Sequence, residues 1–553
     1  MDEDVATLLT RTAVAAKLLF VLLVWPTPCQ GQSNPDLVRD MQSQAVKSGQ
    51  SAWGYWGTNS GGYYDWCNHS NRLVPVYTFG MDLSSVKEGK SSYRDKASLL
   101  KLYTTIPEGT FNPNADYFDQ TDICALQLLA AQAGKKVIVL MVYDGLDWQT
   151  TRAAAIYRSG KVGYTVGRGT GLRFQDYRGA PTDFGFCVTS PHNETTEFDV
   201  NTQTLTQPQS ESQGGYDFHM AGSTPWDLPK NAGYLFGWDQ LRYHPVTDSA
   251  NAATAMVTGR KTYNGSVNVD PAGNQLPTVA HLLQQQRGFS IGVVTNVPIS
   301  HATPAAAYAH NVSRLDHQDL TRDLLGLPSI AHPQEPLPGV DVLLGAGWSD
   351  DAATDVDQGA NHHSGNKYLT DVDRLRLDTT AGGKYIVAER SAGQSGALLL
   401  EVAARTALQQ KKRLLGVFGV KSGHLPFQTA NGDYQPTDGV TPTETYSAAD
   451  LKENPTLAEM TRTALSVLSM NPNGFWMMVE AGDVDWASHD INIDNAIGAV
   501  LSGDEAFEAV VKWVEEKQAW HETAIIVTSD HGHGFFLTDP NAFAEAGRTD
   551  MTR

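Results

Sequence analysis

Continuous apolar runs alternate with amphipathic segments along most of the chain. The run at 136–144 is apolar nearly throughout and ends on an aspartate followed by a glycine. Such runs are typical of strands buried on both faces of a sheet. Further runs of this form occupy 73–79, 288–296, 475–480 and 523–530. The pattern therefore predicts at least five strands.

Segments with helical periodicity lie between these runs, at 93–103, 122–133, 276–286, 397–410, 455–470 and 504–517. Alternating strands and helices predict a three-layer α/β/α sandwich with a central, mostly parallel sheet. Sheets of this kind place their sites just beyond the carboxyl ends of the strands. Residues 165–245 are polar and glycine-rich without clear periodicity, so we expect them to form an insertion over such a site.

The N-terminus has the pattern of a signal peptide. Arg11 and Lys17 precede the apolar run 18–25, which is followed by prolines and a small-residue segment ending near Gly31. We therefore expect residues 1–31 to be removed and the protein to be secreted or periplasmic. A membrane anchor is the alternative, but the run is short for a bilayer span and we expect no stable membrane span. The mature chain would then comprise an N-terminal segment, 32–133, that contributes a strand, and a main α/β domain, 134–553.

Charge and cysteine content limit the chemistry. The formal net charge is −20, which argues against nucleic acid as a partner because no basic surplus exists to neutralise its phosphates. The four cysteines include no CxxC pair, so a metal site would have to use histidines and carboxylates. A site for anionic esters would need local positive charge, which metal ions and an arginine supply.

Acidic and histidine side chains follow the predicted strands. Asp485 and His489 come after the strand that ends near Glu480, and in a helix they would share one face, as two ligands of one metal do. A capped helix start explains the same residues without a metal. Asp144, Asp530, His531 and His533 also stand at strand ends, where an ordinary turn or solvated loop is the alternative.

Asp248 and Ser249 begin a run of small helix-compatible residues. An ordinary N-cap accounts for this pattern. A functional interpretation puts Ser249 at a helix N-terminus, where backbone N–H groups favour a phosphoryl group.

The order of these motifs resembles the alkaline phosphatase family. A strand-end Asp is followed by Asp-Ser-Ala at 248–250, His-Ala-Thr-Pro-Ala-Ala at 301–306, Glu-x4-Asp-x3-His at 480–489 and Asp-His-x-His at 530–533. The resemblance covers about 136–540 and includes Thr-Gly-Arg-Lys-Thr-Tyr-Asn-Gly at 258–265 and Ala-Tyr-Ala-His-Asn-Val-Ser-Arg at 307–314.

The resemblance implies hydrolysis of phosphate monoesters through a phosphorylated Ser249, with Arg314 gripping two phosphate oxygens and Asp248 orienting it. It implies two zinc ions and one magnesium ion as cofactors. The implied ligands are Asp144, Thr303 and Glu480 for magnesium; Asp144, Asp530 and His531 for the zinc beside Ser249; and Asp485 and His489 for the other zinc. It puts His301 and His533 around these ligands.

One family feature is missing where the resemblance requires it. The family takes a third ligand of the first zinc from a histidine downstream of Asp-His-x-His, yet no histidine follows His533. A truncated chain is one explanation. The other is a circular permutation, because the spacing from His69 to Val74 and Tyr77 matches the family's C-terminal segment. A loop carrying the Asn68-His69-Ser70 glycosylation sequon before an unrelated strand is the third interpretation.

Other functions of the same superfamily stay open at this point. A sulfatase requires Cys or Ser in a C/S-x-P-x-R context, which the residues after Ser249 lack. A phosphodiesterase is compatible with the residues, as is a non-catalytic secreted binding protein that kept the fold. The oligomeric state is also open, with a homodimer as one option.

Overall fold

Ten strands form one central sheet in the computed structural model, which describes residues 36–194, 196–207, 213–238, 243–352, 357–442 and 444–551. The expected signal peptide at 1–31 lies outside the described residues. The strand order is β12 (Tyr385–Glu389), β13 (Arg413–Val417), β9 (Val342–Ala346), β8 (Ser290–Pro298), β14 (Phe475–Ala481), β4 (Val137–Tyr143), β15 (Thr523–Thr528), β2 (Val74–Phe79), β5 (Thr182–Val188) and β3 (Phe118–Asp119).

The sheet is parallel from β12 to β15, and β2 runs antiparallel to both of its neighbours. In register, Glu480 on β14 lies between Thr295 on β8 and Val142 on β4. Thr528 at the end of β15 also pairs with Val142. The carboxyl ends of four central strands therefore meet along one edge of the sheet, which is where the candidate residues follow.

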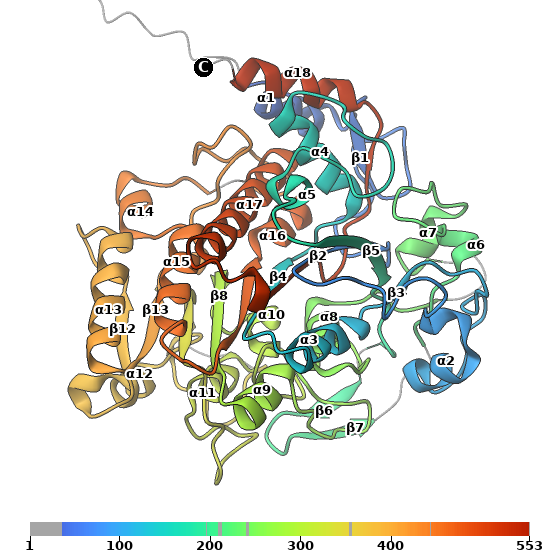
Figure 1. The fold of residues 1–553 in the computed structure, drawn as a ribbon. Helices are drawn as coiled ribbons and strands as arrows, with labels where there is room; N and C mark the ends of the chain where they lie inside the picture. The colour runs from blue at the N-terminus through green and yellow to red at the C-terminus, as the bar shows by residue number, and fades with distance from the viewer. Residues whose placement is uncertain are drawn as a thin grey trace, which may run out of the picture. The chain divides into compact units, whose positions relative to one another are not determined.

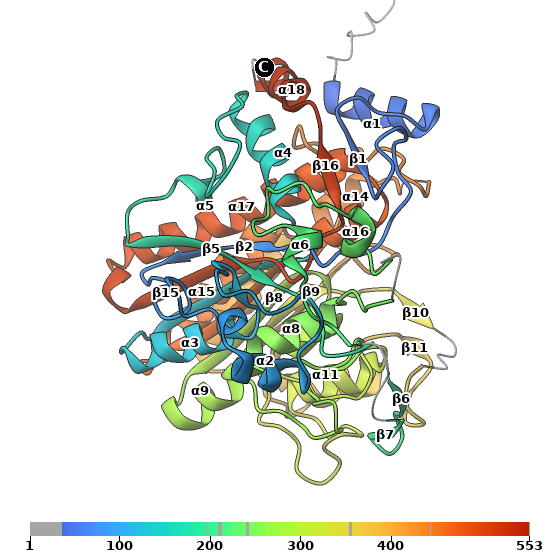
Figure 2. The same ribbon diagram turned by 90° about the vertical axis from the view of Figure 1, so that its right-hand side faces the viewer.

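The two faces of the sheet carry separate apolar cores. On β4, Val139 and Met141 belong to one core, whereas Ile138 and Leu140 belong to the other. All seven residues of β4 are buried, as expected for a strand covered on both sides. The resulting three layers are visible in Figure 1 and, after rotation, in Figure 2.

One core is covered by α1 (Leu37–Ser48), α4 (Trp148–Ser159), α13 (Gly396–Gln410), α15 (Leu457–Leu468), α17 (Ile493–Glu516) and α18 (Pro540–Met551). The other is covered by α3 (Asp122–Gln132), α8 (Ser249–Thr258), α9 (Val279–Arg287), α10 (Ala302–Ala306) and α11 (His317–Leu325).

The shorter elements are α2 (Lys96–Tyr103), α5 (Arg173–Asp176), α6 (Phe218–Ala221), α7 (Ala232–Leu235), α12 (Asp371–Leu377), α14 (Ala448–Glu453), α16 (Asp483–His489), β1 (Gly54–Trp56), β6 (Glu197–Asp199), β7 (Thr204–Gln207), β10 (Asp351–Ala352), β11 (Gly365–Asn366) and β16 (Phe535–Leu537). The described residues also form three 3₁₀ turns, at Ser92–Arg94, Thr379–Ala381 and Trp520–Glu522.

The predicted α/β sandwich is confirmed, and all five predicted strands are present as β2, β4, β8, β14 and β15. Three local expectations differ from the structure. The helix expected at 93–103 is split at Asp95, which caps α2 and separates it from the 3₁₀ turn at Ser92–Arg94. The helix expected at 504–517 begins earlier, at Ile493. Its first turns are buried nearly all round and so have no amphipathic period by which the sequence could have shown them. The segment 165–245 supplies β5 to the central sheet, so it does more than cover an existing site.

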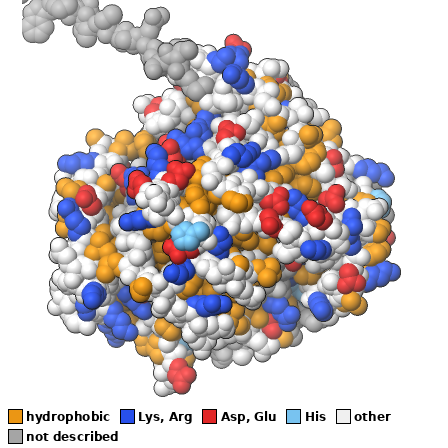
Figure 3. All heavy atoms as spheres, viewed as in Figure 1, with side chains coloured by type: hydrophobic (Ala, Val, Ile, Leu, Met, Phe, Trp, Pro, Cys, Tyr) orange, Lys and Arg blue, Asp and Glu red, His pale blue; other side chains and the backbone are white. Residues whose placement is uncertain are grey.

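Charged side chains are interspersed on the face shown in Figure 3, where Lys and Arg lie among Asp and Glu. Within the described part of the chain, no helix combines the length and apolar character needed to cross a membrane.

The buried Asp494 in the first turn of α17 generates a test of stability. Its Oδ1 accepts a hydrogen bond from Ala430 N–H at 3.1 Å, and burial raises its pKa to about 7, with Asp36 adding to the effect and Arg39 opposing it. Because the folded carboxyl keeps its proton to a higher pH than the unfolded one, stability falls as pH rises from about 4 to about 7.

We expect Asp494→Asn, which retains the acceptor, to stabilise the protein above pH 7 by on the order of 1–3 kcal/mol, since each pKa unit corresponds to about 1.4 kcal/mol. Urea unfolding at a series of pH values measures this. The advantage of Asn should shrink toward pH 4, and an advantage that does not change with pH would contradict the assignment.

Candidate metal centre

Backbone pairing brings His69 to the carboxyl edge of the sheet. Ser70 N–H donates to Gly532 O at 2.6 Å, in an antiparallel bridge between the segment before β2 and the segment after β15. β1 and β16 continue this contact as a two-stranded antiparallel ladder. His69 therefore lies beside the Asp-His-Gly-His segment although more than 450 residues separate the two in sequence.

His69, His489 and Asp485 converge on one point. His69 Nε2 lies 3.0 Å from His489 Nε2, and the two nitrogens lie 3.5 and 3.4 Å from Asp485 Oδ1. The Nδ1 atoms of His69 and His489 face the backbone oxygens of Thr247 and Cys67 at 3.0 and 2.9 Å.

Those carbonyls require each Nδ1 to carry its proton, so in the neutral rings both Nε2 atoms are bare. Two lone pairs and a carboxylate oxygen then face one another, an arrangement that a cation between them satisfies. A ring whose other nitrogen donates to a backbone carbonyl is also the usual setting of a metal-bound histidine.

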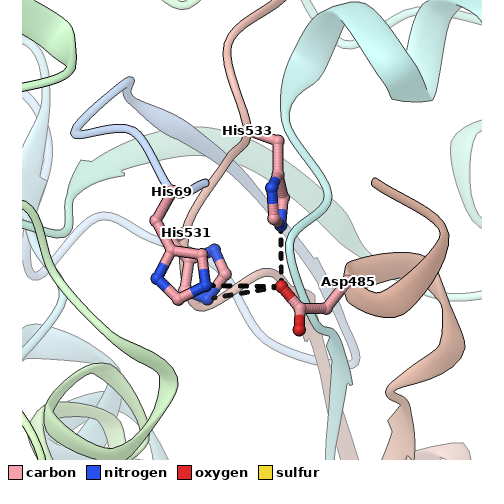
Figure 4. Close-up of side chains that lie close together, drawn as sticks. All are labelled: His69, Asp485, His531 and His533. Atoms are coloured by element: carbon pink, nitrogen blue, oxygen red, sulfur yellow. Dashed lines mark hydrogen bonds and ion pairs between the residues drawn. The ribbon is translucent and has the colours of Figure 1, made fainter. Parts of the chain in front are cut away.

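His531 and His533 approach Asp485 from the segment after β15, as Figure 4 shows. His533 Nε2 lies 2.7 Å from Asp485 Oδ1, and His531 Nε2 lies 3.9 Å from the same oxygen. The rings of His69 and His531 stack with centroids 3.7 Å apart. His533, expected around the ligands, thus contacts Asp485 directly.

A second group consists of Asp144, Asp530 and His531. His531 Nε2 is 3.3 Å from Asp144 Oδ1 and 3.3 Å from Asp530 Oδ2. Ser249 Oγ lies 3.2 Å from the same nitrogen. The turn after Asp144 needs glycine, because Gly145 has φ +74° and a Cβ there would come within 2.7 Å of His533.

Glu480 and Thr303 lie on the other side of Asp144. Thr303 Oγ1 donates to Asp144 Oδ2 at 3.3 Å, and Thr295 on β8 donates to Glu480. His301 precedes α10 and packs edge-on against Trp486, with ring centroids 5.8 Å apart. Asp144, Thr303 and Glu480, the three residues that the resemblance implies for magnesium, therefore lie close together.

Ser249 and Arg314 are held by a shared partner, Asp248. Asp248 is the N-cap of α8, where its Oδ1 accepts from Asn251 N–H at 2.9 Å, while its Oδ2 pairs with Arg314 Nη1 at 3.0 Å. The helix N-terminus predicted for Ser249 is confirmed. Ser249 and Arg314 also line one cavity of about 440 Å³ together with His69, His301, Asp485 and His489.

Buried carboxyl groups dominate the electrostatics. Burial raises the pKa of Asp144 well above its ordinary value, that of Glu480 to about 8 and that of Asp530 to about 6, with repulsion from neighbouring carboxylates adding to each. Burial also acts upward on Asp485, but the surrounding histidines outweigh it and hold that pKa well below its usual range. Divalent cations beside these groups would favour the charged carboxylates throughout.

The donor set fits metal ions by a second criterion. Several buried atoms here have no hydrogen-bond partner among the described residues, namely Asp144 Oδ1, Glu480 Oε1, Asp530 Oδ2, His301 Nδ1, His531 Nδ1 and His533 Nδ1. Buried polar groups are normally satisfied, so this concentration of free oxygen and nitrogen atoms calls for missing partners. Two groups of side chains could each hold a metal ion, because the ligand atoms within each group lie within 4.8 Å of one another. These groups are His69–Asp485–His531–His533 and Asp144–Asp530–His531.

Every predicted site residue thus lies in this region, and two contributors were not predicted. Thr295 donates to Glu480, and Trp486 lines the cavity beside His301. Thr295 sits within a buried strand, where a threonine gives no distinctive pattern. Trp486 lies between Asp485 and His489 in the motif and could have been considered for that reason.

Comparisons of the sequence with a family model and with curated proteins point to the same family. A family model described as alkaline phosphatase matches residues 236–548, more than half of the chain. Alkaline phosphatase 4 of Bacillus subtilis is 29% identical over 303 residues, covering 54% of this chain and 51% of the relative. Alkaline phosphatase of Escherichia coli is 30% identical over 313 residues, covering 54% and 60%. The chain belongs to the alkaline phosphatase family.

The chain spans about half to three fifths of the length of the curated relatives it matches. Among solved structures, a cold-active alkaline phosphatase from Shewanella sp. aligns with 22% identity and a TM-score of 0.41, covering 72% of this chain and 68% of the other. The family match begins at residue 236, so His69 and Asp144 lie outside it. Their position in the site comes from the geometry alone.

The shared role of Asp248 yields a prediction. Asp248→Ala removes the cap of α8, worth about 1 kcal/mol, and also the partner of Arg314. We expect the free energy of unfolding to fall by about 1–2 kcal/mol in urea titrations. Asp248→Asn keeps a capping oxygen and should lose less. Equal stability of the Ala variant and the wild type would contradict this role.

Proposed function

We propose that the protein hydrolyses phosphate monoesters through a phosphoserine formed on Ser249. One observation carries the proposal. Ser249 Oγ stands at the N-terminus of α8, 3.2 Å from His531 Nε2, in a cavity that also contains the guanidinium of Arg314. A nucleophilic oxygen, a cationic oxygen clamp and a cluster of metal-type donors are the parts that phosphoryl transfer requires.

The residues fit two zinc ions and one magnesium ion. Asp144, Asp530 and His531 would hold one zinc next to Ser249; His69, Asp485 and His489 would hold the second; and Asp144, Thr303 and Glu480 would hold magnesium. When bound, such ions lower the pKa of hydroxyl groups and water and stabilise negative charge on phosphoryl oxygens.

The chain's own groups orient the substrate. Asp248 fixes Arg314 through Nη1, which leaves other guanidinium N–H groups to bind two phosphate oxygens. The N-terminal end of α8 adds a favourable partial positive charge beside the phosphoryl group. Because Ser249 is the first residue of that helix, its oxygen faces the site that these groups define.

The reaction has two displacements. Ser249 Oγ attacks phosphorus in line and loses its proton, the bond from phosphorus to the ester oxygen breaks, and the alcohol leaves protonated. Water then attacks the phosphoserine, the bond from phosphorus to Oγ breaks, and inorganic phosphate leaves as Ser249 regains its proton. Arg314 can bind the equatorial oxygens in both steps.

We further propose that His69 serves as the third ligand of the zinc held by Asp485 and His489, in a circularly permuted arrangement of the family fold. Support comes from the 3.0 Å distance to His489 Nε2 and from the bare Nε2 of each ring. The strand β2, which begins at Val74 shortly after His69, pairs antiparallel with β15. The His69–Val74–Tyr77 spacing belongs to this same strand and its lead-in.

We also propose that the enzyme acts outside the cytoplasm. This rests on the basic residues and apolar run within the first 31 residues of the sequence, which have the pattern of a signal peptide.

The nucleophile can be tested by trapping. Incubation with radiolabelled phosphate at acidic pH should label wild type, whereas Ser249→Ala should take up no label and lose roughly 10³-fold or more in turnover of p-nitrophenyl phosphate. Ser313→Ala, which removes the hydroxyl of the residue before Arg314, is the matched control and should retain label. Label on any residue other than Ser249 would refute the mechanism. Faster turnover of the bis ester than of the monoester would favour a phosphodiesterase instead.

The role of His69 can be tested by metal content. His69→Ala should bind about one zinc ion fewer per chain and lose activity, as His489→Ala should, because each removes one of three ligands. His521→Ala is the control, because His521 is exposed and lies in the 3₁₀ turn before β15. Elemental analysis with wild-type zinc content in His69→Ala would rule this ligand out.

A further inference from the structure

A second group of metal-type side chains lies outside the candidate centre. His310 follows α10, Asp323 lies in α11, and His332 lies in the loop after α11; we refer to these three residues as the His310 cluster. Their ligand atoms all lie within 4.8 Å of one another. None of the three belongs to the residues assigned above to phosphoryl transfer or its metal ions.

His310 presents a bare nitrogen. Its Nε2–H donates to the backbone oxygen of Leu276 at 2.8 Å, which leaves Nδ1 without a proton. The residue is only 6% exposed, and Nδ1 has no hydrogen-bond partner among the described residues. Burial, followed by the effect of His281, lowers its pKa to about 3, so the ring is neutral at physiological pH. Donation to a backbone carbonyl with the other nitrogen free is the pattern of a metal-bound histidine.

His332 faces acceptors with both ring nitrogens. Its Nδ1 lies 2.9 and 3.1 Å from the two oxygens of Asp323, and its Nε2 lies 3.2 Å from Gln275 Oε1. The amide orientation of Gln275 is set by its Nε2, which donates to Ala331 O at 3.4 Å. A neutral imidazole has one N–H, so one nitrogen lone pair of His332 must oppose an oxygen.

Two changes resolve that conflict: protonation of His332, or a cation between His332 Nδ1 and Asp323. Protonation would leave a simple ion pair with Asp323 and would do nothing for the bare Nδ1 of His310. A cation satisfies both rings at once. With the ion at His332 Nδ1, the Nε2–H of His332 donates to Gln275 Oε1. The 2.9 and 3.1 Å separations of His332 Nδ1 from the Asp323 oxygens are close to the edge of a tetrahedron whose metal–ligand bonds are about 2.0 Å long.

We propose that the His310 cluster binds a divalent ion of the zinc type. Two imidazoles with one carboxylate favour zinc or a similar transition metal over calcium or magnesium, which prefer oxygen ligands. Asp323 is held for this role by two donors, because it accepts hydrogen bonds from His310 N–H at 3.0 Å and from Ser329 Oγ–H.

The ion would link the segment after α10 to α11 and to the loop that follows α11. The residues before α9 are attached through the hydrogen bonds of the two rings to Leu276 O and Gln275 Oε1. Arg314 stands four residues after His310, and the intervening Asn311 pairs with Val267 through two backbone hydrogen bonds of 2.9 Å. A metal at the His310 cluster therefore anchors the segment that leads to Arg314. Its role is structural and does not depend on the proposed reaction.

The test is zinc stoichiometry in the full-length protein. Wild type, His332→Ala and His332→Gln are loaded with ZnCl₂, desalted and analysed by inductively coupled plasma mass spectrometry, with circular dichroism to establish folding. We expect each His332 variant to contain about one zinc ion fewer than wild type. His281→Gln is the matched control, because its ring lies 5.1 Å from that of His310 but its Nδ1 accepts from Thr278 N–H in a capping box that Gln also satisfies.

Turnover of p-nitrophenyl phosphate separates this site from the centre near Ser249. A His332 variant should lose zinc while retaining at least half of its activity at saturating zinc, whereas His69→Ala should lose both. Equal zinc content in wild type and in folded His332→Ala and His332→Gln would overturn the proposal and leave the protonated ion pair as the explanation.

Discussion

The burial of negative charge at the carboxyl edge of the sheet is the constraint on which this structure depends. Asp144, Glu480 and Asp530 lie at the ends of adjacent parallel strands, each almost completely shielded from water. Carboxylates in such a position repel one another and lose hydration, which costs several kcal/mol per ion unless positive charge compensates. The fold brings them together nonetheless, with the bare nitrogens of His69 and His489 close by. Their arrangement is therefore best understood as a cage for cations.

Two features of the fold make that cage. The parallel strands supply carboxylates at a common level, because the ends of β4, β14 and β15 are in register. The strand β2 runs antiparallel to β15, so its N-terminal end lies at the edge where the parallel strands have their C-terminal ends. The residues before β2 therefore lie beside the residues that follow the parallel strands. A parallel strand in this place would present its C-terminal end instead. The reversed direction of one strand is thus what gives His69 access.

Much of the architecture could be predicted because its strands are buried on both faces and read as continuous apolar runs. β9, β12 and β13 were not predicted, since each has only five residues and no distinctive boundary. Within the site, the four-residue spacing of Asp485 and His489 indicated a shared helical face, and α16 confirms it. Local spacing says nothing, however, about which distant segments meet. His69 could be considered only through a family resemblance, and its contacts arise from sheet order, which no periodicity encodes.

The long sequence distance within the site has a consequence for biogenesis. His69 and His489 are separated by 420 positions, and β2 adds to β15 only after β15 has been made. During synthesis one edge of β2 can pair with β5, but its other edge stays open to incorrect partners until β15 has emerged. Closing so large a loop also slows folding, because its entropy is lost before the distant contacts form. We therefore expect the pairing of β2 with β15, which carries His69 into the site, to be a late step in folding.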